Sequence, residues 1–455
     1  MKPRRLFRLR DTDDVSHLLL RNPRPASAGR TLLRVLGGAL ALLATVAVVL
    51  VLVARLLLAP QAGGWAAQVA IGPARLDLDV PTLLRLGTSP WFGPRLAGHR
   101  LNTRWGPVAL GWENASRTLQ VHCAPCSLRV PALGVQPLRV DDLVLRLHSD
   151  FNRFSGTLDA GTADSRGPRL YATWTGQLDR STLALEVDLP ATPIAHWYAV
   201  ALPRLPEAAR VQIDGTLALR AHAELPSGRF RLEPVATGFQ VSGLGTESLA
   251  GAVSACGRPS RLRQDDWLAR AVIAAEDQRF EEHPGYDPQE LAAALGANQA
   301  RGQALRGGST LTQQLAKLLV AGDERSAERK LRELLYAVEM EQTLGKARIL
   351  QLYLDNVPWG EGVCGAEAAA RHYFGRSARS LVPAQAVWLA AMLHNPGREA
   401  ASWQETGDIN RTRAGWVADG VRGVPGLGRR QRAAFLQSVA DARWRAPPVT
   451  KGQHN

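Results

Sequence analysis

The sequence is poor in cysteine and in lysine. Only 4 of its 455 residues are cysteine, which is too few for a scaffold built from disulfides. The 42 glycines and 28 prolines follow no three-residue period, so the chain is not collagen-like. Arginine outnumbers lysine by 50 to 5, and the net charge of +14 reflects this usage. With 45% apolar residues the chain can form packed cores, and its length favours two or three domains of roughly 150 residues each.

The first 60 residues combine a basic segment with a long apolar run. Residues 1–34 hold nine Lys or Arg against three Asp, and residues 35–54 carry no charge. A helix needs about 20 apolar residues to cross a bilayer, whereas a cleaved signal peptide has a shorter apolar region. We therefore predict one transmembrane helix over 35–59. Basic flanks stay cytoplasmic and favour anionic membrane lipid, so residues 1–34 need no nucleic-acid partner.

Residues 60–255 show the pattern of β-strands. Apolar and polar residues alternate over 183–189 and 211–220, a period of two that is typical of half-buried strands. Similar runs occur at 75–80, 118–121, 143–147 and 169–175. We assign turns to 114–116 and 155–156. The pattern predicts a β-rich antiparallel module, either one curved sheet or a sandwich. No acid pair or nucleophile constellation stands out in it, which favours a spacer or a partner-binding module.

The cysteines leave alternatives open. Cys123 and Cys126 form a C-x-x-C motif, but strand-like runs flank it where a redox motif needs a helix start. A structural disulfide or an isolated thiol pair fits better, and a zinc site lacks two further ligands at suitable spacing. Cys256 and Cys364 could pair in an oxidising compartment, which the sequence does not decide.

From Trp267 the apolar period becomes helical and leads to Glu276. A carboxyl group at the end of an apolar helix face has a pKa raised by burial, which suits general acid or base catalysis. The alternative for this stretch alone is an ordinary solvated helix end.

Residues 306–317 form a glycine-containing loop followed by an amphipathic helix with Ser309 as the expected N-cap. Free N–H groups at a helix start, together with hydroxyls and Lys317, suit a phosphate ligand. No Gly-Lys-Ser/Thr follows the glycines, so this is not a Walker loop. The alternative is a capped helix with a solvated polar face.

Residues 323–333 place Arg329 and Glu333 four positions apart on one helix face, where they can pair. The alternative is a surface salt bridge. Three of the five lysines, Lys317, Lys330 and Lys346, fall in this block. This concentration indicates positions that need a compact ammonium group.

Together these stretches resemble the peptidoglycan glycosyltransferases (glycosyltransferase family 51). The family's motifs appear in order between 267 and 396: EDQRFEEHPG from Glu276, GGSTLTQQLAK from Gly307, RKLRE from Arg329, ILQLYL from Ile349 and HYFG from His372. The resemblance implies a lysozyme-like, mainly α glycosyltransferase domain over 256–400, facing the periplasm and anchored in the bacterial inner membrane by a single-pass helix. Its substrates would be lipid II and the growing glycan strand.

The resemblance also implies residue roles. Glu276 would be the general base, and Glu333 would position donor groups. Lys317 and Arg325 would bind the departing pyrophosphate. The remaining substrate-binding positions are Arg329, Ser309, Thr310, Gln314, Asp277, Phe280 and His283. No cofactor is required, although Mg²⁺ or Mn²⁺ assists at the pyrophosphate in some members. The β-rich module would offer a surface to cell-wall synthesis proteins.

Four positions depart from the family pattern. Leu318 and Asp355 stand where Asn is usual, Gln351 where Glu is usual, and Ala293 where Arg is common. These departures leave open a degenerate transferase acting as a membrane-anchored cell-wall scaffold. A lysozyme-like, glycan-cleaving enzyme is a further alternative. Residues 401–455 are expected to form a short helical tail. The chain has no Ser-x-x-Lys, so no transpeptidase activity is expected.

Overall fold

The computed structural model describes residues 38, 40, 42–49, 65–71, 74–128, 137–179, 181–203, 205–301, 307–321, 326–407, 410–421 and 428–440. The chain forms two compact units, 1–83 and 84–455. Most of the predicted membrane segment, 35–59, lies outside the described residues. Within the described part of the chain, no helix is both long enough and apolar enough to cross a bilayer.

The unit 1–83 contains an antiparallel strand pair. β1 (Ala66–Ile71) pairs with β2 (Ala74–Asp79), with Ala66 opposite Asp79. Helix α2 (Val80–Gly87) follows at once and crosses into the second unit. The side chain of Asp79 accepts hydrogen bonds from the backbone N–H and the hydroxyl of Thr82, which satisfies free donors in the first turn of α2.

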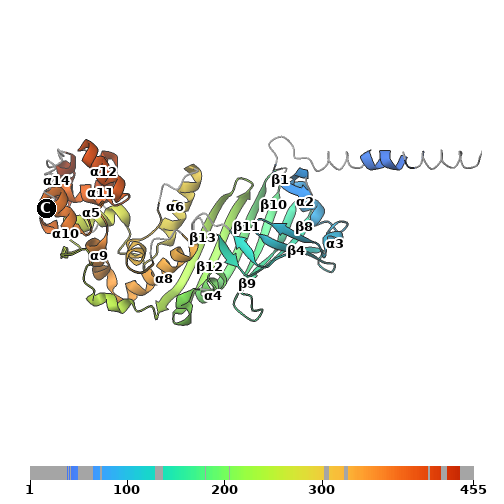
Figure 1. Ribbon diagram of the computed structural model, residues 1–455, viewed down its shortest axis with the longest axis horizontal. Helices are drawn as coiled ribbons and strands as arrows, with labels where there is room; N and C mark the ends of the chain where they lie inside the picture. The colour runs from blue at the N-terminus through green and yellow to red at the C-terminus, as the bar shows by residue number, and fades with distance from the viewer. Residues whose placement is uncertain are drawn as a thin grey trace, which may run out of the picture. The chain divides into compact units, whose positions relative to one another are not determined.

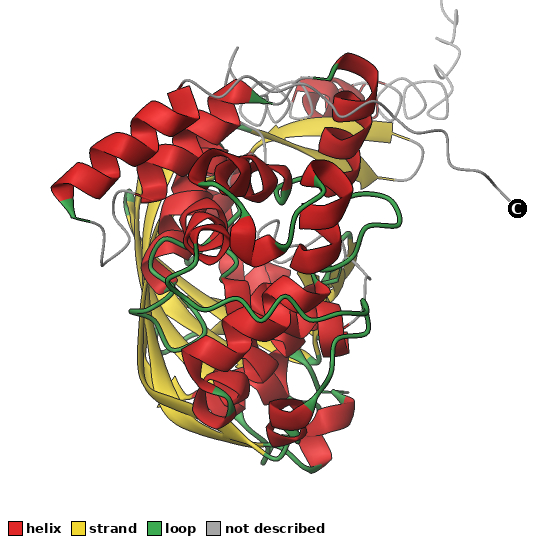
Figure 2. Cartoon of the chain, turned by 90° about the vertical axis from the view of Figure 1, so that its left-hand side faces the viewer, coloured by secondary structure: helices red, strands yellow, loops and turns green. Residues whose placement is uncertain are grey.

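The β-rich module of the second unit is built on a nine-stranded antiparallel sheet in the order β13-β12-β11-β10-β9-β8-β5-β4-β3. Its strands are β3 (Arg100–Thr103), β4 (Gly106–Glu113), β5 (Thr118–Cys123), β8 (Asp142–Asp150), β9 (Arg153–Gly161), β10 (Arg169–Leu178), β11 (Leu183–Pro193), β12 (Gln212–Leu225) and β13 (Arg229–Ser242). The predicted antiparallel module is confirmed, as a single sheet that curves (Figure 2).

One predicted turn is wrong. Gly156 lies inside β9, opposite Leu147 on β8 and Trp174 on β10. A Cβ at this position would meet the carbonyl oxygen of Arg146 and the ring of Trp174. The glycine therefore allows close approach between neighbouring strands and does not mark a turn. The predicted turn at 114–116 does separate β4 from β5.

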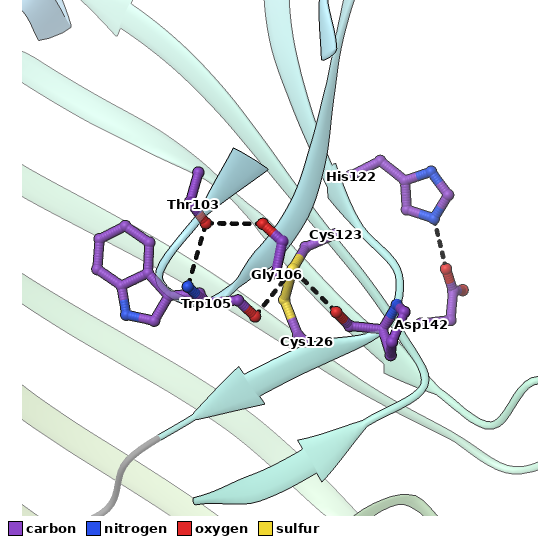
Figure 3. Close-up of a disulfide and its surroundings, with 8 residues drawn as sticks. Thr103, Trp105, Gly106, His122, Cys123, Cys126 and Asp142 are labelled. Atoms are coloured by element: carbon purple, nitrogen blue, oxygen red, sulfur yellow. Dashed lines mark hydrogen bonds and ion pairs between the residues drawn. A yellow bond between two sulfur atoms is a disulfide. The ribbon is translucent and has the colours of Figure 1, made fainter. Parts of the chain in front are cut away.

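Cys123 and Cys126 form a disulfide between the end of β5 and the start of β6 (Cys126–Leu128) (Figure 3). β6 pairs with β7 (Leu138–Val140). Gly106 packs against this loop with φ of +131°, and a Cβ there would meet the carbonyl oxygen of Pro125. The two cysteines belong to a small core with Val140 and Val200. Strands flank the pair on both sides, so it serves as a structural crosslink.

A helical domain follows the sheet. Its helices are α5 (Trp267–Glu276), α6 (Pro288–Arg301), α7 (Leu311–Ala316), the π-helix η4 (Lys317–Ala321), α8 (Ala327–Thr343), α9 (Gly345–Asn356), α10 (Ala366–Phe374), α11 (Pro383–Met392), α12 (Pro396–Thr406), α13 (Arg411–Val421) and α14 (Arg429–Ala440). α6 and α8 pack against β13 (Figure 1). The predicted mainly α domain is confirmed.

A second disulfide joins the segment before α5 to the loop after α9. Cys256 and Cys364 are 108 positions apart, with Cα atoms at 5.2 Å. The same segment is held by Asp355, which accepts hydrogen bonds from the N–H and the hydroxyl of Ser260. These contacts fasten the start of the helical domain to α9.

Candidate active site

Helix α5 places Glu276 at the edge of the helical core. Leu268, Val272 and Ala275 are buried, and Glu276 is the last residue of the helix. Only 11% of the Glu276 side chain is exposed. Its Oε2 accepts a hydrogen bond of 3.0 Å from Gln314, while the buried Oε1 has no hydrogen bond and lies 3.6 Å from Arg413. The predicted buried-edge carboxylate is therefore present.

Burial raises the pKa of Glu276 above its ordinary value. The Gln314 hydrogen bond and the positive charge of Arg413 oppose this increase by stabilising the carboxylate. A carboxyl group with a raised pKa and one oxygen without a hydrogen-bond donor is suited to accept a proton, as a general base must.

Gln314 is itself held in one orientation. The hydroxyl of Tyr353 on α9 donates a hydrogen bond of 2.8 Å to its Oε1, which leaves the amide Nε2 to donate to Glu276. Tyr353 is buried, and burial raises its pKa well above the ordinary value, so it keeps its proton to donate. Tyr353 belongs to the fourth motif, but the sequence pattern does not predict that it orients Gln314.

Arg413 on α13 is a site residue that sequence reasoning missed. Its guanidinium donates a hydrogen bond of 3.0 Å to the carbonyl of Ala275 and lies 4.2 Å above the ring of Trp416. It comes from the segment 401–455, for which the sequence predicts a short helical tail. Its sequence signal, an Arg three positions before a Trp, does not distinguish it from the chain's other arginines.

Three first-motif residues hold the site together from inside. Asp277 accepts hydrogen bonds from the backbone N–H of Leu311, at 2.8 Å, and from Nε2 of His283, at 2.9 Å. His283 Nδ1 accepts from the N–H of Gly285, so its proton is on Nε2. Phe280 is fully buried. These side chains join the end of α5 to the start of α7, and their predicted contact with substrate stays a prediction.

The N-cap of α7 is Thr310, so the prediction of Ser309 is wrong. The Thr310 hydroxyl accepts from the N–H of Gln313, and the Gln313 side chain accepts from the N–H of Thr310, which completes a capping box. The same hydroxyl donates to the carbonyl of Gly285 at 2.7 Å. Both residues of this capping box are buried. Thr310 thus holds the second motif against the first.

Three charged residues of α8, which we call the α8 charge group, are Arg329, Lys330 and Glu333. Glu333 is 1% exposed. Arg329 pairs with its Oε1, and Lys330 lies 3.0 Å from its Oε2. Lys330 also donates to the hydroxyl of Ser309. The predicted Arg329–Glu333 pair exists, but it is buried, and the surface salt bridge considered as its alternative is wrong.

Lys330 has an unusual environment for a lysine. Burial lowers its pKa to about 8, and the positive charges of Arg329 and Lys317 act in the same direction. Lys317 is exposed at the start of η4. Arg325, the other predicted pyrophosphate ligand, lies outside the described residues. Lys330 was recognised in the sequence only as one of three clustered lysines, and its contacts now place it in the site.

The second motif links the two carboxylates. Ser309 contacts Lys330 of the α8 charge group, and Gln314, five residues further, contacts Glu276. A single short segment therefore touches both groups. The segment therefore contacts a cation at its Ser309 end and a proton acceptor at its Gln314 end.

Two of the four residues that depart from the family pattern make side-chain hydrogen bonds. Gln351 accepts a hydrogen bond of 3.0 Å from Arg348, which also donates to the carbonyls of Leu249 and Ala252. Asp355 holds Ser260, as described above. Leu318 is 38% exposed, and Ala293 is exposed on α6. The contacts described for Glu276 and Glu333, with Gln314, Arg413, Arg329 and Lys330, involve none of these four positions.

A divalent metal does not fit the α8 charge group. Both oxygens of Glu333 already face cations. Among the described residues, no group of three or more His, Cys, Asp or Glu could hold a metal ion. The donor set around Lys330 is cationic and suits an anion.

Comparisons with known proteins agree with the motifs. A family model described as Transglycosylase matches residues 262–421. The chain is 50% identical over 129 residues to a biosynthetic peptidoglycan transglycosylase of Nitrosomonas eutropha, which covers 28% of this chain and 53% of that protein. The chain thus spans little more than half the length of that relative.

Two further relatives carry the same description and match over a longer stretch. The protein of Stutzerimonas stutzeri is 45% identical over 175 residues, which is 38% of this chain and 71% of the relative. That of Pseudomonas fluorescens is 44% identical over 182 residues, which is 40% of this chain and 72% of the relative. On this similarity and on the motifs around Glu276 and Glu333, the chain belongs to the biosynthetic peptidoglycan transglycosylase family.

Proposed function

We propose that the protein is a peptidoglycan glycosyltransferase that polymerises lipid II into glycan strands and releases undecaprenyl pyrophosphate. The supporting observation is that one segment, Ser309 to Gln314, contacts both the buried carboxylate of Glu276 and the α8 charge group. The family relationship supports the same activity.

In the proposed reaction, Glu276 takes the proton from the 4-hydroxyl of the acceptor sugar while that oxygen attacks C1 of the lipid-linked donor. The bond between C1 and the pyrophosphate oxygen breaks, and both of its electrons leave with the pyrophosphate. Lys330, Arg329 and Lys317 stabilise this developing negative charge. Arg329 and Lys330 are held by Glu333 before the reaction, so they can act where charge appears in the transition state.

A lipid-linked substrate requires the active site to stay at a membrane. We therefore propose that residues 35–59 anchor the protein in the inner membrane, with the N-terminus cytoplasmic and the helical domain periplasmic. The lysozyme-like shape of the domain and the binding of cell-wall synthesis proteins by the β-rich module belong to the same proposal. The cationic donor set favours catalysis without a required metal.

The proposal is tested by incubating the full chain, purified in detergent, with labelled lipid II and separating the products by size. Polymer that disappears when moenomycin, an inhibitor of this family, is added is the expected result. A parallel incubation with isolated sacculi tests the glycan-cleaving alternative through release of muropeptides. Absence of polymer from a folded protein, with Glu276→Gln equal to wild type in complementation, would contradict the proposal in favour of a scaffold.

A further inference from the structure

Helix α8 presents two different stripes of residues. A residue turns by about 100° around a helix axis from the previous one, so Arg329, Lys330 and Glu333 lie on one side. Arg332, Glu339 and Thr343 recur at seven and then four positions and lie along another side. The first stripe forms the α8 charge group. The residues of the second stripe contact parts of the chain outside the candidate active site.

The second stripe contacts the β-rich module and the connection that follows it. Arg332 lies 3.1 Å from Glu207, which belongs to the short 3₁₀ helix η2 (Pro206–Ala209) between α4 and β12. Glu339 is 2% exposed and accepts hydrogen bonds from the backbone N–H groups of Leu244, at 2.8 Å, and Thr246, at 3.2 Å. Thr343 and Thr246 share a hydrogen bond between their hydroxyls. A buried carboxylate with two backbone donors makes this a specific contact.

Tyr198 contacts the backbone of α8 between Lys330 and Glu333. It lies on α4 (Ile194–Ala201), and its hydroxyl donates a hydrogen bond of 3.0 Å to the carbonyl of Leu331. Leu331 is the residue after Lys330 and two before Glu333. Tyr198 is buried, and burial raises its pKa, so the hydroxyl remains a donor. The module therefore touches the backbone of the turn that carries the catalytic charges.

We infer that Tyr198 and Glu207 of the β-rich module are positioning residues for the α8 charge group, and that the module is a working part of the transferase. They act through the backbone of Leu331 and the side chain of Arg332, on two successive residues of α8. A displacement of this turn would move Lys330 away from Ser309, to which it donates a hydrogen bond. In positioned active sites such a displacement of about 1 Å lowers rates by up to roughly 100-fold. The effect on turnover rests on the proposed function, whereas the effect on Lys330 does not.

The test measures the ionisation of Lys330 directly in the full chain. An amine-reactive anhydride is applied at a series of pH values, and modification of the Lys330 peptide is followed by mass spectrometry. The Lys330 side chain is 29% exposed, so the reagent can reach it, and the exposed Lys317 reports on reagent strength. The variants are Tyr198→Phe alone and together with Glu207→Gln. The matched control is Tyr171→Phe with Glu186→Gln, which changes two side chains of the module that are 48% and 70% exposed.

In the control, Lys330 is expected to titrate near pH 8, as in the wild type. In the double variant, water gains access to the loosened turn, so the apparent pKa should rise by roughly 1 unit toward its ordinary value. Polymerisation of lipid II should fall roughly tenfold, with little change in the control. If a thermal melt shows that the double variant is unfolded, the Tyr198→Phe single variant is used for the test. Its Lys330 titration and its polymerisation rate are then compared with those of the control.

A Lys330 titration and a rate equal to those of the control would overturn the inference. If the wild type makes no polymer but Lys330 still shifts in the variants, the positioning role stands and the proposed function fails. If the wild type polymerises and neither variant changes Lys330 or the rate, the proposed function stands and the module has no part in positioning.

Discussion

Gln314 donates a hydrogen bond of 3.0 Å to Oε2 of Glu276, and Tyr353 fixes the orientation of that amide from the other side. Tyr353 of the fourth motif orients Gln314 of the second motif. Gln314 in turn orients the carboxylate of Glu276 in the first motif. The three motifs are separated in the sequence but form one hydrogen-bonded unit, which explains why none of them alone identified the site.

The first prediction concerns the acid side of the pH–rate profile. Glu276 must be deprotonated to act as a base, so activity should increase with pH through the pKa of Glu276, which burial raises above the ordinary value of a glutamate. Gln314→Ala removes a hydrogen bond that stabilises the carboxylate, so the pKa of Glu276 should rise further and this limb should move to higher pH. The measurement is kcat/KM for lipid II between about pH 4 and about pH 9. Tyr353→Phe, which keeps Gln314, should give a smaller shift, and an unmoved limb in Gln314→Ala would contradict the assignment.

The second prediction concerns the alkaline side. Lys330 has a pKa of about 8, so it loses its charge as pH rises through that value and activity should fall. Lys330→Arg keeps a cation that stays protonated throughout, so the alkaline limb should move above about pH 10 even if the maximal rate drops. Lys346→Arg is the matched control for a change of lysine to arginine, because Lys346 contacts Glu341, the carbonyl of His283 and the ring of Phe280, and Lys330 contacts Glu333 and Ser309. An alkaline limb unchanged by Lys330→Arg would assign it to another group.

Sequence reasoning predicted the parts of the site that depend on local pattern. The helix ending at Glu276 and the pair Arg329–Glu333 follow from spacing within one helix. Arg413 and Tyr353 could not be found this way, because they reach Glu276 and Gln314 from positions 137 and 39 residues away. Their contacts depend on how the helices pack, which no spacing within one motif records.

The two local errors, at Ser309 and Gly156, have the same origin. Ser309 and Thr310 are both good N-cap residues, and Thr310 is the cap because its hydroxyl also reaches the carbonyl of Gly285. Gly156 was assigned to a turn because glycine favours turns, but here it accommodates the neighbouring strand. In both cases a tertiary contact selected between choices that were locally equivalent.

The third prediction separates a supporting residue from a substrate ligand. Thr310→Val removes the cap and the Gly285 contact, so the free energy of unfolding should fall by roughly 1–2 kcal/mol. The KM for lipid II should change little, since Thr310 is buried. Denaturant unfolding and steady-state kinetics are the measurements, and Thr310→Ser should restore stability. An increase in KM at unchanged stability would return Thr310 to the substrate-binding residues.

The fourth prediction compares the two disulfides. Closing a loop of 108 residues lowers the entropy of the unfolded chain far more than closing one of three. Replacing Cys256 and Cys364 by Ser should therefore lower the stability of the helical domain by up to about 4–5 kcal/mol. Replacing Cys123 and Cys126 by Ser should lower the stability of the β-rich module by much less. Thermal unfolding under non-reducing conditions is the measurement, and equal losses in the two variants would contradict the entropic explanation.

The last prediction concerns Lys317, which is exposed and whose positive charge lowers the pKa of Lys330. Lys317→Ala should have two separable effects. The KM for the donor should increase more than that for the acceptor, because a cation near the pyrophosphate is lost. The alkaline limb should move to higher pH, because Lys330 keeps its proton more easily once a like charge is removed. Kinetics with separate donor and acceptor analogues across pH measure both. If the KM for the donor increases but the alkaline limb does not move, Lys317 lies too far from Lys330 to affect its pKa. Lys317 would then bind the pyrophosphate independently of the α8 charge group.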